Sequence, residues 1–243
     1  NGNPFLCQGS KNKISENNSP EDFDFNFNFN PEDIETEDTI NAVFAVDVSS
    51  SVGSYVSELN NGMNEFVQRM QKSHVSEKLF VSIVEFSSDV KVKTGFQPIS
   101  QLPIMDFTKS IGGMTSLYEG VRVALKNTID YREGLENVGV QAKSLLFILT
   151  DGENNMPGSA DSVKTMINDL MKEERNFGSF ETILFGIGKE NESYFKQAAE
   201  DMGIKHVATI ENSPEEIKKM VAFISSSVSS ASGNGQAIST PNF

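Results

Sequence analysis

Two kinds of hydrophobic pattern alternate along the chain between residues 40 and 228. Short, continuous apolar runs, typical of strands buried on both faces, occur at residues 40–48, 79–86, 144–150, 181–188 and 204–210. Segments with an apolar residue at every third or fourth position, typical of amphipathic helices, occur at residues 52–72, 117–131, 162–174, 192–201 and after Pro214. This alternation predicts one α/β domain built around a mainly parallel sheet.

Two local signals refine this pattern. The run VKVKTGF at residues 90–96 follows the strand at 79–86 after only the turn at 87–89, so these two strands must pair antiparallel. The last helix opens with the sequence SPEE, in which Ser213 is the expected N-cap, a proline suits the first helical position, and Glu216 completes a capping box.

Both ends of the chain differ from this domain in composition. Residues 1–39 contain 9 Asp and Glu against 2 Lys, and are rich in Asn, Ser and Pro. The sequence from Ser225 onward is small and polar, which is typical of a flexible segment. We therefore divide the chain into an acidic arm at 1–39, an α/β domain at 40–228 and a flexible tail at 229–243.

The acidic arm contains an unusual alternation of aromatic and polar residues. In an extended strand, a period of two places every aromatic ring on one face, and the rings are those of Phe23, Phe25, Phe27 and Phe29. A disordered tail is the alternative, because the intervening Asp and Asn are poor strand formers. Exposed rings on one face are an aggregation hazard. We therefore expect the arm to pack on a domain surface, its own or a neighbour's, the latter giving self-association.

The composition argues against several classes of protein. With 20 Lys and Arg against 34 Asp and Glu, the net charge is −14, which disfavours binding to nucleic-acid phosphates or anionic membranes. Cys7 is the only cysteine, so neither an internal disulfide nor a cysteine zinc site is available. No apolar run reaches the roughly 18 residues needed to cross a bilayer. The sequence opens without the basic and apolar segments of a signal peptide, which favours a cytoplasmic or virion-associated protein.

Three segments carry residues that can bind a metal ion. They are DVSSS at residues 47–51, GGMTS at 112–116 and DGE at 151–153. The carboxyl ends of parallel strands meet at one edge of the sheet, so the three segments are expected to lie together there. In a turn directly after a strand, the side chains of D-x-S-x-S converge on one point, and the next helix directs its N–H groups there. Carboxylate and hydroxyl ligands without imidazole or thiolate suit a hard cation such as Mg²⁺.

The same segments resemble the von Willebrand factor A (VWA) family, which includes the integrin-type I domains. VDVSSSVG matches that family's DxSxS element, GGMTSLYEG its threonine loop, and LLFILTDGEN its strand followed by Asp-Gly. FGIG at 185–188 is similar to its penultimate strand, and Ser50 stands where the family commonly has Gly. The resemblance covers residues 40–228. It implies a three-layer, Rossmann-like α/β fold whose six-stranded, mainly parallel sheet has the order 3-2-1-4-5-6, with residues 90–96 as the antiparallel edge strand.

The resemblance also implies a metal-ion-dependent adhesion site (MIDAS). Ser49, Ser51 and Thr115 would offer hydroxyl ligands, and Asp47 and Asp151 would bind the ion directly or through water. The ion would be Mg²⁺, with Mn²⁺ or Ca²⁺ as alternatives, and an acidic residue of a protein partner would fill the last coordination position. The expected function is a non-enzymatic module for protein binding or assembly.

Other interpretations of these residues compete with a MIDAS. Asp47 and Ser49 would also suit the cap of the following helix without any metal. A metal-dependent phosphatase or hydrolase would use Asp47 as nucleophile, but such enzymes usually carry a second Asp where Ser49 stands. Nor does a His or Lys follow a strand nearby to transfer a proton. A structural assembly subunit, intracellular or viral, would use the fold as a rigid body with an empty site.

Neighbouring polar residues have simpler explanations than metal binding. Glu85 and Glu153 are expected to be exposed to solvent, and the side chain of Ser50 is expected to point away from the metal. The glycines at 186–188 do not indicate a dinucleotide loop, because Asn191 stands where its third glycine would be.

Overall fold

The computed structural model describes residues 39–172 and 180–232. Within these residues, one sheet has six strands in the order β3-β2-β1-β4-β5-β6. The strands are β1 (Thr39–Asp47), β2 (Leu79–Phe86), β3 (Val90–Pro98), β4 (Ala142–Thr150), β5 (Phe180–Ile187) and β6 (His206–Ile210). Neighbouring strands are parallel except β2 and β3, which are antiparallel. The expected strand order and the antiparallel edge strand are both confirmed.

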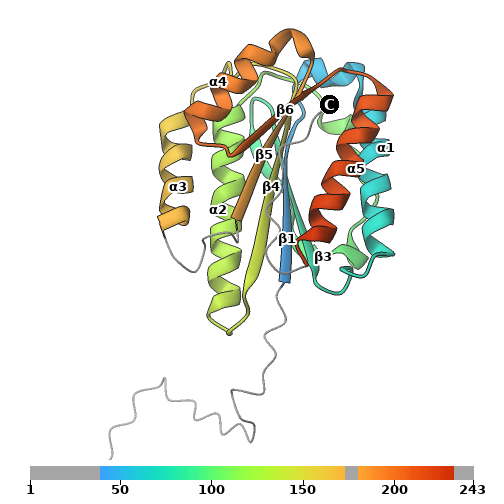
Figure 1. Ribbon diagram of the computed structural model, residues 1–243. Coiled ribbons are helices and arrows are strands. Elements are labelled where there is room, and N and C mark those ends of the chain that lie inside the picture. Colours follow the sequence, from blue (N-terminus) through green and yellow to red (C-terminus); the bar gives the residue numbers. More distant parts are fainter. Residues whose placement is uncertain (1–38, 173–179, 233–243) are drawn as a thin grey trace, which may run out of the picture. The chain divides into compact units, whose positions relative to one another are not determined.

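Helices cover both faces of this sheet (Figure 1). On one face, α1 (Val56–Gln71) and α5 (Pro214–Ser230) lie side by side. The other face is covered by α2 (Leu117–Glu136), α3 (Ala160–Lys172) and α4 (Glu192–Met202). A short 3-10 helix, Ser50–Ser54, separates β1 from α1. The arrangement is the expected three-layer α/β fold.

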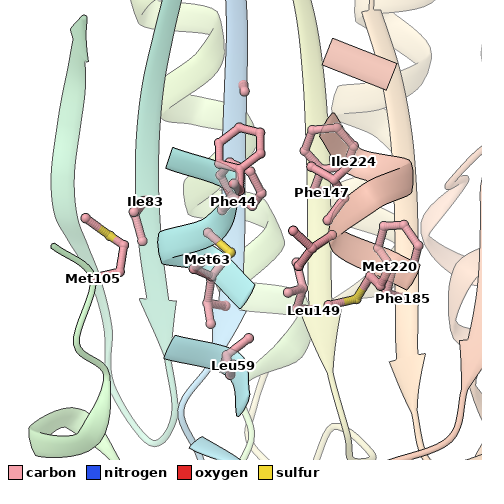
Figure 2. Packing of buried hydrophobic residues seen from close by; sticks show 14 of the residues in the cluster. Phe44, Leu59, Met63, Ile83, Met105, Phe147, Leu149, Phe185, Met220 and Ile224 are labelled. Carbon is pink, nitrogen blue, oxygen red and sulfur yellow. The ribbon is translucent and has the colours of Figure 1, made fainter. Parts of the chain in front are cut away.

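The inner strands are apolar on both faces because successive side chains enter two different core layers. Phe44 of β1 packs toward α1 and α5, whereas Val43 and Ala45 pack toward α2 and α3. Figure 2 shows the first layer, in which Phe44 and Phe147 of the sheet belong to the same buried cluster as Met63 of α1. The Phe44 and Phe147 rings are stacked with their centroids 5.3 Å apart. Such close packing fixes the point at which each strand leaves the core.

Glu85, at the end of β2, is buried, and the prediction that it is exposed is wrong. Only 1% of its surface is accessible. Its carboxylate forms ion pairs with Lys93 and, at 3.3 Å, with Lys91, and it accepts a hydrogen bond from Ser110 Oγ at 2.8 Å. Glu85 therefore ties β3 to the loop that leads toward the threonine segment. The two lysines on the edge strand β3 also discourage pairing with another chain.

The N-cap predicted for α5 is confirmed. Ser213 Oγ accepts a hydrogen bond from Glu216 N at 3.3 Å. The other half of the capping box is not formed: Ser213 N donates to Glu211 O at 2.9 Å, and the Glu216 carboxylate accepts a hydrogen bond from Lys219 Nζ at 2.6 Å.

Helix α5 continues beyond Ser225, where the composition predicts a flexible segment, and ends at Ser230. Val228 is fully buried and extends the apolar stripe of the helix by one turn. Ser225 is compatible with this burial because its hydroxyl donates to Val221 O at 2.8 Å. Within the described residues, no helix is long and apolar enough to cross a membrane. The acidic arm lies outside the described residues, so its packing stays a prediction.

The contact between Gly186 of β5 and Phe195 of α4 provides a test of the packing. A Cβ at position 186 would lie 2.0 Å from Phe195 Cδ2, and this ring is fully buried. Gly186→Ala should therefore lower the free energy of unfolding by about 1–3 kcal/mol in urea denaturation. The control is Gly134→Ala in α2, where a Cβ meets nothing within 4 Å and should raise stability by up to about 1 kcal/mol. Equal effects of the two substitutions would contradict this packing.

Candidate metal-binding site

The first predicted segment begins where the central strand β1 ends. Asp47 is the last residue of β1, and Ser49 and Ser51 follow in the turn that opens the 3-10 helix. Asp151 follows β4, which is parallel to β1, so both strands end at the same edge of the sheet. Ser51 Oγ donates to Asp151 Oδ1 at 2.8 Å, and Ser49 Oγ lies 3.2 Å from Ser51 Oγ. The structure thus brings the two serines and the second aspartate together.

Thr115 reaches the same edge through the Gly-rich loop. The φ of Gly113 is 81°, a left-handed conformation that glycine adopts without strain. Ser50 N donates to Gly113 O at 3.2 Å, which holds this loop against the turn after β1. Thr115 is buried, and a Cβ on Gly152 would lie 3.5 Å from its Oγ1. The hydroxyl of Thr115 therefore faces the residue that follows Asp151.

Asp47 is held deep in the structure by hydrogen bonds to both carboxylate oxygens. Its Oδ1 accepts from Ser49 N at 2.8 Å and its Oδ2 from Thr150 Oγ1 at 2.7 Å. Only 1% of the residue is exposed. Burial raises the pKa of Asp47 from 3.8 to about 6, although these hydrogen bonds act in the opposite direction. The folded domain therefore carries an anion that is poorly solvated at neutral pH.

Asp151 adds a second carboxylate to the same edge. Burial raises its pKa, with a smaller contribution from repulsion by Glu190, while hydrogen bonds from Ser51 and Tyr55 lower it. No ion pair formed within the described residues involves either Asp47 or Asp151. Among the residues that the structure describes, the negative charge of these two aspartates is thus offset by hydrogen bonds but not by an ion pair with a basic side chain.

The chemistry of these residues fits a hard divalent cation. The five predicted ligands offer only carboxylate and hydroxyl oxygens, which are the ligand atoms that Mg²⁺ and Ca²⁺ prefer. In the part of the chain that the structure describes, no group of three or more His, Cys, Asp or Glu is arranged to hold a metal. A metal at this edge would therefore depend on the serine and threonine hydroxyls as well as on the two aspartates.

Two further hydroxyls contact the aspartates and were not assigned to the site from the sequence. Tyr55, which the periodicity places among the apolar positions of a helix, is buried and hydrogen-bonds to Asp151. Thr150 binds Asp47 from the end of β4. The sequence could have indicated a role for Thr150, because its hydroxyl stands at the end of an otherwise apolar strand, next to Asp151. Nothing in the sequence distinguishes Tyr55 from an ordinary core aromatic residue.

Some polar residues around the predicted ligands behave as the sequence predicts, and others have contacts that it did not predict. Ser50 directs its hydroxyl to Gly113 O at 3.0 Å, and Glu153 is exposed, both as expected. Asn154 and Asn155, to which the sequence analysis gave no role, connect the Asp151 loop to residues of the threonine segment and of α2.

A family model described as the von Willebrand factor type A domain matches residues 41–223. The chain belongs to the von Willebrand factor A family. The match runs from β1 into α5 and includes all five predicted ligands of this VWA domain. A search of curated proteins found no match.

Solved structures with this fold share little sequence with the VWA domain. The PilB minor pilin from Streptococcus sanguinis is 13% identical, with a TM-score of 0.51 over 81% of this chain and 62% of the pilin. The pilus adhesin SpaC from Lactobacillus rhamnosus GG is 11% identical, with a TM-score of 0.59 over 79% of this chain and 30% of the adhesin. Proximal thread matrix protein 1 from the mussel byssus, in a structure with a zinc-occupied MIDAS motif, is 15% identical, with a TM-score of 0.51 over 78% of this chain and 46% of that protein. The chain spans less than two thirds of each, and these likenesses show the fold alone.

Asp47→Asn should stabilise the metal-free VWA domain at neutral pH. The folded-state pKa of Asp47 is raised from 3.8 to about 6, so ionisation destabilises the folded form above that pH, and this effect disappears as the pH falls below about 4. At about 1.4 kcal/mol per pH unit, the gain for the amide is about 3 kcal/mol above pH 7. Urea denaturation in EDTA between pH 4 and 8 measures the difference. A gain independent of pH, or a loss at pH 8, would contradict the burial of a charged Asp47.

Proposed function

We propose that this VWA domain is a non-enzymatic protein-binding module that holds a divalent cation at a MIDAS and uses it to bind a carboxylate of a partner. One observation carries the proposal. Hydroxyl and carboxylate oxygens from three separate loops converge at one edge of the sheet, where two aspartates have no basic partner among the described residues. A cation is the simplest group that would offset this charge.

The ligands assigned to the cation are Ser49, Ser51 and Thr115 through their hydroxyls, and Asp47 and Asp151 directly or through water. Mg²⁺ is the proposed ion, because it keeps several waters and needs few protein carboxylates. Mn²⁺ and Ca²⁺ use the same oxygen chemistry and are the alternatives. The zinc-occupied MIDAS motif of the mussel protein supports metal use by this fold.

The cation supplies a positive charge where the protein alone is negative. Asp47 and Asp151 lie at this edge, and Glu190 is close enough to raise the pKa of Asp151. Without the ion, an approaching carboxylate would be repelled. With the ion in place, the carboxylate would complete the coordination, so partner binding and metal binding are coupled.

The environment of Asp47 argues against a hydrolase that uses this residue as nucleophile. A nucleophilic carboxylate needs an oxygen lone pair directed at the substrate. Asp47 is only 1% exposed, which hinders the approach of a substrate to its oxygens. The names of the neighbouring structures, a minor pilin, a pilus adhesin and a thread matrix protein, also support adhesion or assembly rather than catalysis.

Mg²⁺ and Mn²⁺ should raise the thermal midpoint of the domain, because a ligand that binds only the folded state stabilises it. At 100 times the dissociation constant this amounts to about 2.7 kcal/mol. Ser51→Ala should reduce the rise, since it removes one ligand. Ser57→Ala, which changes an exposed serine in the first turn of α1, should leave the rise intact. Identical wild-type midpoints in EDTA, Mg²⁺ and Mn²⁺ would rule out the assigned metal site.

A partner captured from native extract in Mg²⁺ and lost in EDTA should contribute an essential Asp or Glu. Replacing that residue by its amide should weaken binding by about 2–5 kcal/mol, the usual effect of removing one member of a buried charge pair. Titration calorimetry of the amide variants measures this loss. Binding that survives both EDTA and Ser49→Ala would place the interface on another surface.

A further inference from the structure

Asn155 lies between two of the loops that carry the assigned ligands, and the sequence gave it no role. We propose that Asn155 is a positioning residue for the metal site, which fixes Thr115 relative to the loop of Asp151. The inference rests on the proposed function, because it concerns the affinity of the same site for its cation.

Asn155 satisfies both backbone polar groups of Thr115. Thr115 N donates to Asn155 Oδ1 at 2.7 Å, and Asn155 N donates to Thr115 O at 3.0 Å. The asparagine thus binds the threonine backbone as a neighbouring strand would, with one bond from its main chain and one to its side chain. These two bonds connect the threonine loop directly to the segment that begins at Asp151.

The threonine loop needs such an anchor because its own backbone is permissive. Gly112 and Gly113 precede Thr115 and have φ values of 154° and 81°. Other bonds hold the residues on either side: Met114 N donates to Ser88 Oγ at 2.9 Å, and Ser116 N donates to Ser87 O at 3.0 Å. Those bonds lead to the turn between β2 and β3. The bonds of Thr115 itself lead to Asn155.

The neighbouring residue, Asn154, bonds the segment that contains Asn155 to other parts of the fold. Its backbone N donates to the hydroxyl of Tyr194 in α4 at 2.6 Å, and its Nδ2 donates to Met156 O at 2.7 Å. Its Oδ1 accepts from Tyr118 N, in the first turn of α2, at 3.4 Å. The segment that holds Thr115 is therefore itself fixed to two helices.

Rigid placement matters for the ion that this site is proposed to bind. Mg²⁺ requires near-ideal octahedral geometry, so ligands from separate loops must be held in position before the ion arrives. Groups that orient metal ligands without touching the metal commonly change its affinity by about 10–100-fold when they are removed. Asn155 is exposed to solvent at the surface of the loop, so its substitution leaves the apolar core intact.

The test compares Asn155→Ala with Asn155→Asp, which keeps an oxygen acceptor for Thr115 N. Asn155→Ala should speed amide exchange of Thr115 N–H in EDTA and weaken Mg²⁺ binding by about 10–100-fold, while the metal-free thermal midpoint stays close to that of the wild type. Asn155→Asp should restore slow exchange and recover most of the affinity. Glu153→Gln, an exposed change in the same loop, measures how strongly one unit of charge alters Mg²⁺ binding, so the added charge of Asn155→Asp can be taken into account.

Several results would overturn the inference. Unchanged Mg²⁺ affinity in Asn155→Ala would show that the hydrogen bonds between Asn155 and Thr115 do not serve the metal site, even if the Thr115 amide proton exchanges faster. Asn155→Ala could also lower the thermal midpoint of the metal-free domain and weaken Mg²⁺ binding in proportion, with no rescue by Asn155→Asp. That result would assign Asn155 a general structural role instead. If the wild type itself binds no Mg²⁺, the proposed function fails and this inference fails with it. Equal Mg²⁺ binding by the wild type and Asn155→Ala is a different outcome, which contradicts this inference alone.

Discussion

The burial of Asp47 at the end of the central strand is the constraint on which the surrounding structure depends. A carboxylate removed from water is strongly disfavoured unless other groups satisfy it. The backbone N–H of Ser49 and the hydroxyl of Thr150 do so in part, yet the pKa of Asp47 stays raised to about 6. The turn after β1 and the end of β4 thus each supply a hydrogen-bond donor to this one buried anion.

The fold supplies the rigidity that such a site requires. β1 has β2 on one side and β4 on the other, and its side chains enter both core layers (Figure 2). Because β1 and β4 are parallel and in fixed register, Asp47 and Asp151 emerge at the same edge. The threonine loop has no such support from the sheet. Its position depends on hydrogen bonds to the turn after β1, to the turn between β2 and β3, and to Asn155.

Much of the fold could be predicted from the sequence, because it follows from local patterns. The buried strands were recognisable as apolar runs, and the short turn after β2 required an antiparallel edge. The contribution of single polar residues was less accessible, since their partners are distant in sequence. Glu85 was expected to be exposed, but Lys91 and Lys93 reach it from the next strand. The serine-rich end of α5 looked flexible, because composition does not reveal that Val228 is buried.

In the candidate site, too, local motifs could be recognised from the sequence, whereas contacts between distant residues could not. The residues assigned to the metal came from three separate motifs of the family resemblance. The structure brings the segments that carry them to one edge of the sheet, and their binding of a metal stays a prediction. The residues that hold those ligands in place could not be predicted. In the sequence, Tyr55 is indistinguishable from the apolar positions of a helix, and Asn155 from any other polar loop residue. Their roles follow from contacts across the fold, with Asp151 and Thr115 respectively.

Diffraction from crystals of the domain grown with Mn²⁺ tests the central claim most directly, since the anomalous signal locates the ion without assumptions about its ligands. The account predicts one strong peak at the carboxyl edge of β1 and β4, about 2.0–2.3 Å from the hydroxyl oxygens of Ser49 and Ser51. The absence of a peak there at saturating Mn²⁺, or a peak only at another surface, would contradict it.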